Sequence, residues 1–197
     1  MRFLLLMTTV LSPVLAAAQA GDDAASLRRP NWNVAATVGG GPGLVDRSNV
    51  QFIRGGVRLS RVFTHELGTG PLRGTFEEGI EFNPVDEVLW KGRHDFYGFS
   101  VNPIVAKWNF TASRKVVPYF MIHGGMLHTN QKVPPPNTST VNFTTGGGFG
   151  VQYFLKPGRS ISWDVCAIHL SNASLGDHNP GVNASLQFQL SYIWWKH

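Results

Sequence analysis

Near the end of the chain, side chains suited to acyl transfer lie within four positions of one another. The segment AIHLSNASLGDHNPGVN (167–183) places His169 two residues before Ser171, and Asn172 follows the serine. In a β-strand, residues i and i+2 share a face and lie roughly 6–7 Å apart at Cα, so the imidazole can reach the hydroxyl. A base beside a serine hydroxyl is the minimum arrangement for nucleophilic acyl transfer. The same spacing is also typical of an ordinary polar pair at a strand end, so both interpretations stay open.

The rest of the chain is patterned as β-structure. Runs in which polar and apolar residues alternate, as they do in strands, recur between turn-rich segments. Eight such runs are expected, at about 31–41, 50–63, 72–83, 95–109, 116–127, 141–155, 159–171 and 183–195. In the last run Leu186, Phe188 and Leu190 alternate with Gln187 and Gln189. Because side chains switch face at every residue, such a strand separates an apolar from a polar environment.

Strand number, strand length and connections indicate a membrane barrel. An even number of strands is typical of bacterial outer-membrane barrels, and runs of about ten residues suit a tilted crossing of the bilayer. Compact connections at 64–71, 111–115 and 156–159 alternate with longer, external ones at 83–94, 128–140 and 172–182. We therefore predict an all-β fold, an eight-stranded antiparallel transmembrane barrel with a lumen filled by side chains and no channel. A soluble β-sandwich would show the same alternation and is the alternative.

The N-terminal segment MRFLLLMTTVLSPVLAAAQA is typical of a secretory signal peptide. It has Arg2, an apolar run and an Ala-Gln-Ala cleavage site at 18–20. The apolar run is short and broken, which disfavours the alternative of a membrane anchor. The expected domains are a signal peptide (1–20) and one barrel (21–197), exported to the bacterial outer membrane. Cys166 is the one cysteine, so an intramolecular disulfide is excluded.

Charge and composition narrow the class of partner. The formal net charge is +5, or +4 without Arg2, and the basic residues are scattered singly. This pattern suits a phosphate-bearing lipid and argues against nucleic acid. Basic residues expected near the external rim, as candidates to bind lipid phosphates, are Arg47, Lys91, Arg93 and Lys132; singly exposed cations are often only solvated. The histidines show no metal-binding spacing, so no metal and no cofactor is expected.

Some residues do not fit a simple inward and outward alternation. Glu78 shares a face with Phe76 and Ile80, where a charge facing the bilayer would be costly, so a bulge or another phase is expected there. Ile168 and Leu170 fall on an otherwise polar face. The chain also ends in WWKH and not on the terminal aromatic residue that is usual for outer-membrane barrels. Structural ion pairs inside the barrel are expected among Glu77, Glu78 and Glu81 and the basic residues Arg54, Arg58 and Arg73.

The motif around the histidine resembles a known family. His-Leu-Ser-Asn-Ala at 169–173, followed by Asn-Pro-Gly-Val-Asn at 179–183, is similar to the lipid A 3-O-deacylase (PagL) family. The resemblance implies an outer-membrane barrel that removes the ester-linked acyl chain at position 3 of lipid A. It implies Ser171 as nucleophile, His169 as general base and Asn172 as an oxyanion donor. The expected partners are lipopolysaccharide and other outer-membrane lipids, and a homodimer is left open.

One position departs from the family's pattern. The residue fourteen positions after His169, where the family carries a glutamate that orients the histidine, is Asn183. An amide oxygen can fix the imidazole tautomer but supplies no negative charge. We expect Asn183 to orient His169 in a weaker catalyst. Asp177 in that role, or a barrel that has lost activity, are the alternatives, and a non-catalytic structural or adhesive barrel is the rival function.

Overall fold

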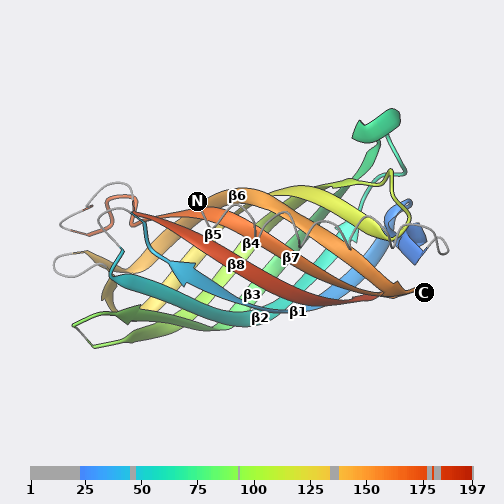
Figure 1. Ribbon diagram of the computed structural model, residues 1–197. Coiled ribbons are helices and arrows are strands. Elements are labelled where there is room, and N and C mark those ends of the chain that lie inside the picture. The colour runs from blue at the N-terminus through green and yellow to red at the C-terminus, as the bar shows by residue number, and fades with distance from the viewer. Residues whose placement is uncertain are drawn as a thin grey trace, which may run out of the picture.

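The chain forms a closed eight-stranded antiparallel barrel, as the sequence predicts (Figure 1). The computed structural model describes residues 23–44, 48–92, 94–133, 138–176, 179 and 183–196. The strands are β1 (Asn31–Pro42), β2 (Val50–Val62), β3 (Gly74–Trp90), β4 (Phe96–Phe110), β5 (Val116–Val133), β6 (Ser139–Lys156), β7 (Arg159–Ser171) and β8 (Asn183–Trp195). Each strand pairs with its neighbours in sequence, and β1 pairs with β8 to close the wall.

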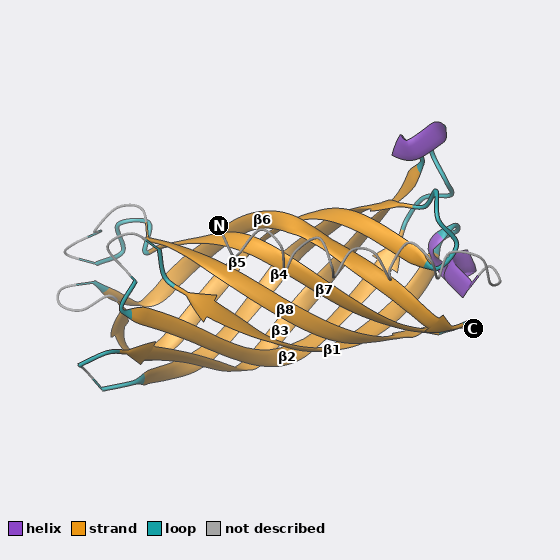
Figure 2. Ribbon diagram, in the orientation of Figure 1, coloured by secondary structure: helices purple, strands orange, loops and turns teal. Residues whose placement is uncertain are grey.

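Two short 3-10 helices, η1 (Asp23–Leu27) and η3 (Gly70–Leu72), lie at one end of the barrel (Figure 2). This end also carries the tight turns 111–115 and 157–158, and short turns in outer-membrane barrels face the periplasm. We call it the periplasmic end, and the opposite end the external end. Among the described residues, no helix is long and apolar enough to cross a membrane. The expected signal peptide, 1–20, lies outside the described residues.

Two strands extend further than the sequence predicts. β3 continues to Trp90 and β5 to Val133, so the expected external loops 83–94 and 128–140 shrink to 91–95 and 134–138. The predicted alternation of compact and longer connections is therefore wrong for the β3–β4 and β5–β6 connections, each of which has five residues, like the turn 111–115. Pro84 lies within β3 although proline, which has no N–H to donate, usually ends a strand. It lies where the β3 register shifts between Asn83 and Asp86. A bulged residue is not paired in the ladder, so the N–H that proline lacks is not required there.

A second bulge at an Asn-Pro sequence occurs in the next strand, β4. An Asn-Pro sequence at 102–103 lies where the register of β4 shifts, and a glycine pair faces each bulge from the neighbouring strand. A Cβ atom at Gly56 would meet Asn83, and one at Gly125 would meet Asn102. Each of these inner glycines lets two strand backbones approach closely, which another residue would prevent.

The barrel is closed at both ends by apolar side chains. At the periplasmic end, η1 contributes to a buried cluster of Ala24, Leu27, Ala35, Val62, Val117, Phe154, Ile193 and Trp195. The external end is filled by Val50, Phe52, Val88, Trp90, Phe96, Leu127, Val133 and Leu170. Ile168 packs in a third cluster with Val105, Tyr119, Met121 and Cys166. The apolar residues on the inward face of β7 therefore belong to these interior clusters.

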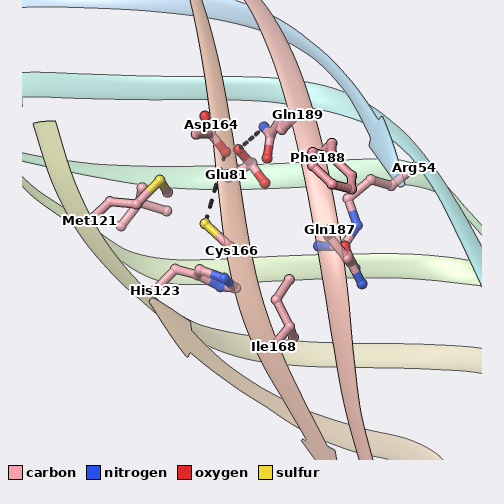
Figure 3. A pocket seen from close by; sticks show the side chains of 11 residues that line it. Arg54, Glu81, Met121, His123, Asp164, Cys166, Ile168, Gln187, Phe188 and Gln189 are labelled. Carbon is pink, nitrogen blue, oxygen red and sulfur yellow. Dashed lines mark hydrogen bonds between the residues drawn. The ribbon is translucent and has the colours of Figure 1, made fainter. Parts of the chain in front are cut away.

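Between the end clusters the lumen holds a network of buried charges. Arg58 pairs with Glu81 and Arg54 with Asp86, each at 3.3 Å, so the predicted pairing of lumen arginines with acidic residues is confirmed for Arg58 and Glu81. Glu81 also accepts a hydrogen bond from Gln189 Nε2 at 3.0 Å; this bond is one of the dashed lines in Figure 3. The cavity at this site measures only about 10 Å³, so side chains fill the space. Arg73 instead lies 3.5 Å from Glu66 near the periplasmic rim.

The outward face of the wall is apolar, as a bilayer requires. Exposed residues along it include Val34, Val38, Ile53, Val57, Leu59, Ile80, Ile104, Ile122, Phe149 and Leu190. Exposed aromatic residues flank this band, with Trp32, Phe63 and Trp194 toward the periplasmic end and Tyr97, Phe99 and Phe143 toward the external end. An apolar band between aromatic girdles is the outer surface of a transmembrane barrel.

Candidate active site

His169 and Ser171 lie on the outward face of β7, at its external end. Both are half-buried, whereas Ile168 and Leu170, which alternate with them, are 5% and 7% exposed inside the barrel. Leu170 anchors this end of β7 in the external apolar cluster, so the strand backbone that carries the pair is held from within. The two polar side chains are thereby presented to the outside of the barrel wall.

The hydroxyl of Ser171 is surrounded by donors. The backbone N–H of Ala173 donates to Ser171 Oγ at 3.3 Å. The Asn179 side chain contacts the same oxygen, with Nδ2 donating at 3.2 Å and Oδ1 lying 3.4 Å away. Within the described part of the chain, no hydrogen bond joins Ser171 to His169, and His169 Nδ1 is buried without a partner. Hydrogen bonds between catalytic groups often tighten only once substrate is bound.

A strained turn follows the serine directly. Leu175 N–H donates to the Asn172 carbonyl at 2.9 Å, and between them Ala173 and Ser174 have φ values of 48° and 64°. Left-handed backbone at non-glycine residues costs of order 1–3 kcal/mol each and occurs often at active sites. Asn172 is 2% exposed and accepts the Ser174 N–H at 3.0 Å, so its side chain supports the turn. The turn directs the Ala173 N–H at Ser171. Oxyanion binding by Asn172 stays a prediction.

Asn179 is the site residue that sequence reasoning missed. It belongs to the Asn-Pro-Gly-Val-Asn stretch used for the resemblance, eight residues after Ser171, but it was assigned no role. Its amide nitrogen lies 3.2 Å from the serine oxygen. A donor at that position can stabilise negative charge that develops beside the nucleophile.

For Asn183 the structure describes the backbone but not the side chain. Asn183 begins β8, where its backbone pairs with Leu170, while Ala184 pairs with His169. The Asn183 side chain is outside what the structure describes, as are Asp177, Arg47 and Arg93. The orienting role of Asn183 therefore stays a prediction.

Two of the predicted rim cations, Lys91 and Lys132, lie in the described part of the chain. Lys91 follows β3, which is four strands from β7 in either direction around the barrel, so the structure does not bring Lys91 to the pair. Lys132 lies within β5 and not in a loop, because β5 continues to Val133. Among the described residues, no three His, Cys, Asp or Glu side chains are grouped so that they could hold a metal ion.

An apolar hollow in the outer wall begins beside the pair. Cross-strand partners run from His169 to Thr145 in β6, then to Gly124 in β5 and Ile104 in β4. The hollow has a volume of about 410 Å³ and is lined by Val101, Pro103, Ile104, Gly124, Gly125, Met126, Phe143, Thr144 and Thr145. Neighbouring strands are about 4.8 Å apart, which puts Gly124 about 10 Å from His169. The polar pair and the apolar hollow therefore adjoin on one surface.

Comparison with known proteins agrees with this architecture. A family model described as lipid A 3-O-deacylase (PagL) matches residues 64–192, which include His169 and Ser171. No curated protein matches the chain in sequence.

Three solved structures resemble the barrel. The crystal structure of the outer membrane enzyme PagL has a TM-score of 0.53 and 21% identity, over 82% of this chain and 98% of that one. Neisserial surface protein A (NspA) has a TM-score of 0.45 and 14% identity, over 84% and 94% of the two chains. The Yersinia pestis outer membrane protein Ail has a TM-score of 0.37 and 15% identity, over 85% and 100%. The likeness to PagL supports the fold.

Proposed function

The chain belongs to the lipid A 3-O-deacylase (PagL) family, and from this membership we propose that it is an outer-membrane esterase that removes the 3-O-linked acyl chain of lipid A. The observation that carries the proposal is the position of His169 and Ser171, which face outward at the external end of β7. A lipid in the external leaflet can bring its ester bond to this surface without leaving the membrane. The substrate is therefore taken from the side of the barrel and not through its lumen.

The reaction follows from the two side chains. Ser171 Oγ attacks the ester carbonyl carbon while His169 accepts the hydroxyl proton. The tetrahedral intermediate collapses, the bond to the sugar oxygen breaks, and His169 returns its proton to that oxygen. Water, deprotonated by His169, then attacks the acyl-serine. The products are a free fatty acid and lipid A with a hydroxyl group at the 3-position.

Negative charge on the carbonyl oxygen needs donors close to the nucleophile. The Ala173 N–H and Asn179 Nδ2 both lie within 3.3 Å of Ser171 Oγ and support this role. Ala173 supplies a backbone donor, and the strained turn that includes it limits how far that donor can shift. One such donor typically contributes about 10²–10³ in rate.

The acyl chain is accommodated by the apolar hollow beside the pair. The lining residues come from β4, β5 and β6, and the hollow starts at Thr145, the cross-strand partner of His169. Its middle is left open by Gly124, where an added Cβ would meet nothing nearer than the Thr144 carbonyl at 3.9 Å. A chain held there would bring its ester end toward Ser171.

Filling the hollow should therefore impair turnover of long-chain substrates. We expect Gly124→Trp to lower kcat/KM for lipid A by at least about tenfold, because each displaced methylene loses about 0.8 kcal/mol of burial. Hydrolysis of an acetate ester, which needs no hollow, should be unchanged. The measurement is steady-state kinetics on both substrates in detergent micelles.

The barrel itself offers a matched control. Gly55 in β2 faces the bulge in β3 in the same way that Gly124 in β5 faces the bulge in β4. A Cβ atom added at Gly55 would also meet nothing nearer than a carbonyl oxygen at 3.9 Å. Gly55→Trp should leave both activities intact. If the two tryptophan variants lose lipid A turnover equally, the hollow has no part in substrate binding.

The proposed function is tested by incubating the purified barrel with lipid A in detergent and measuring free fatty acid. One fatty acid released per lipid molecule is expected. Lipid A that is bound without any release would identify a non-catalytic barrel instead.

A further inference from the structure

A second hollow in the outer wall lies toward the periplasmic end. Its volume is about 240 Å³, and it is lined by Trp32, Leu59, Arg61, Phe63, Glu78, Gly79, Ile80 and Pro103. Most of this lining is apolar, but one basic and one acidic side chain share it. Charges on a bilayer-facing surface are costly unless they reach the interface or find a partner, so this pair requires an explanation.

Arg61 and Glu78 are direct cross-strand partners on the outward face. Arg61 in β2 pairs in register with Glu78 in β3, and both side chains are exposed. The expectation that a bulge or a change of phase removes Glu78 from this face is therefore wrong. Opposed residues have Cβ atoms about 4.5–5.5 Å apart, so the two charged groups border the same small volume.

The guanidinium of Arg61 rests on aromatic rings. Its central carbon lies 5.4 Å from the centre of the Trp32 ring and 5.2 Å from that of Phe63. Within the described residues it makes no ion pair, although Glu78 stands opposite it. Cation–π contacts of this kind hold the group at the level of the aromatic girdle and leave its N–H donors available.

We propose that this hollow binds a zwitterionic glycerophospholipid of the periplasmic leaflet, one whose headgroup carries a phosphate and a primary ammonium. Arg61 receives the phosphate, for which a guanidinium is well suited. Glu78 receives the ammonium, and one acyl chain lies along Leu59 and Ile80. A headgroup with phosphate but no amine would leave its negative charge beside Glu78, so the pair of charges selects against it.

The site is separate from the proposed esterase. Arg61 and Glu78 lie near the periplasmic end of β2 and β3, whereas Ser171 is at the external end of β7. Pro103 borders both hollows, but no charged residue is shared between them. The inference therefore stands whether or not the barrel hydrolyses lipid A.

Native mass spectrometry of the whole barrel, released from detergent, tests the proposal. Phosphatidylethanolamine and phosphatidylglycerol with identical acyl chains are added separately, and the bound fraction is titrated. We expect wild type to bind phosphatidylethanolamine at least about tenfold more tightly. Arg61→Gln should weaken binding of both lipids about tenfold, and Glu78→Gln should abolish the preference between them.

Lys115 offers a matched control. Its ammonium also lies over an aromatic ring at the periplasmic end, 5.3 Å from the centre of Tyr153, but it is outside the hollow. Lys115→Gln should leave both affinities and the preference unchanged. Equal binding of the two lipids by wild type, or an unchanged preference in Glu78→Gln, would overturn the proposal. Circular dichroism of each variant establishes that the barrel is folded.

Discussion

Replacing Ser171 by alanine is expected to reduce hydrolysis of lipid A by the purified barrel by at least about 10⁴-fold, since loss of the nucleophile in a serine protease costs about 10⁶. The variant keeps the backbone of β7, because Leu170 anchors that end of the strand from inside. Binding of lipid A should persist, since the apolar hollow is untouched. Release of fatty acid over time is the measurement.

Ser174 provides the control for this prediction. It lies three residues further along, is exposed, and donates its backbone N–H to Asn172 Oδ1 at 3.0 Å, a bond that the substitution keeps. Ser174→Ala should retain near wild-type activity. His169→Ala should be as inactive as Ser171→Ala, and the double variant no worse, because the two side chains act as one unit. A Ser171→Ala barrel with a tenth or more of wild-type activity would exclude Ser171 as the nucleophile.

Replacing Asn183 has the second largest expected effect. Asn183→Ala should lose most of the activity, and Asn183→Glu should match or exceed wild type, by up to about 10⁴-fold if the amide holds the wrong tautomer. His169 Nδ1 is buried and has no hydrogen-bond partner among the described residues, so a side chain at position 183 that accepts its proton would fix the imidazole tautomer. Alanine cannot accept that proton, whereas a carboxylate accepts it and also supplies a negative charge. The dependence of kcat on each substitution is the measurement.

Asp177 is the alternative source of a carboxylate, and its alanine variant separates the two assignments. If Asn183 orients the imidazole, Asp177→Ala should remain active. An inactive Asp177→Ala together with a fully active Asn183→Ala would assign the orienting carboxylate to the loop before β8. The kinetic comparison needs no change to Ser171 or His169.

Much of the barrel was predictable because a membrane wall imposes a strict period of two. Leu186, Phe188 and Leu190 face the bilayer, and Gln187 and Gln189 face the lumen. This alternation can be read directly from the sequence. The extension of β3 was not predictable, because a bulge at Pro84 depends on the glycine pair facing it from β2. Such pairings join residues distant in sequence, and single-strand periodicity contains no information about them.

The site was predictable where it lies within one strand. His169 and Ser171 share a face because of their spacing alone. Asn179 was missed because its approach to Ser171 depends on the strained turn at Ala173. The position of Lys91 around the rim was not predictable from one strand, because only closure of the barrel puts β3 opposite β7.

Mass spectrometry of lipid A from cells that express the protein tests the central claim most directly. The host must carry a 3-O-linked acyl chain, and wild type is compared with Ser171→Ala at equal barrel levels in the outer membrane. We predict that wild type yields lipid A lighter by one 3-O-linked chain, while Ser171→Ala leaves the mass unchanged. An unchanged lipid A in cells expressing wild type would contradict the assignment of this barrel as a deacylase.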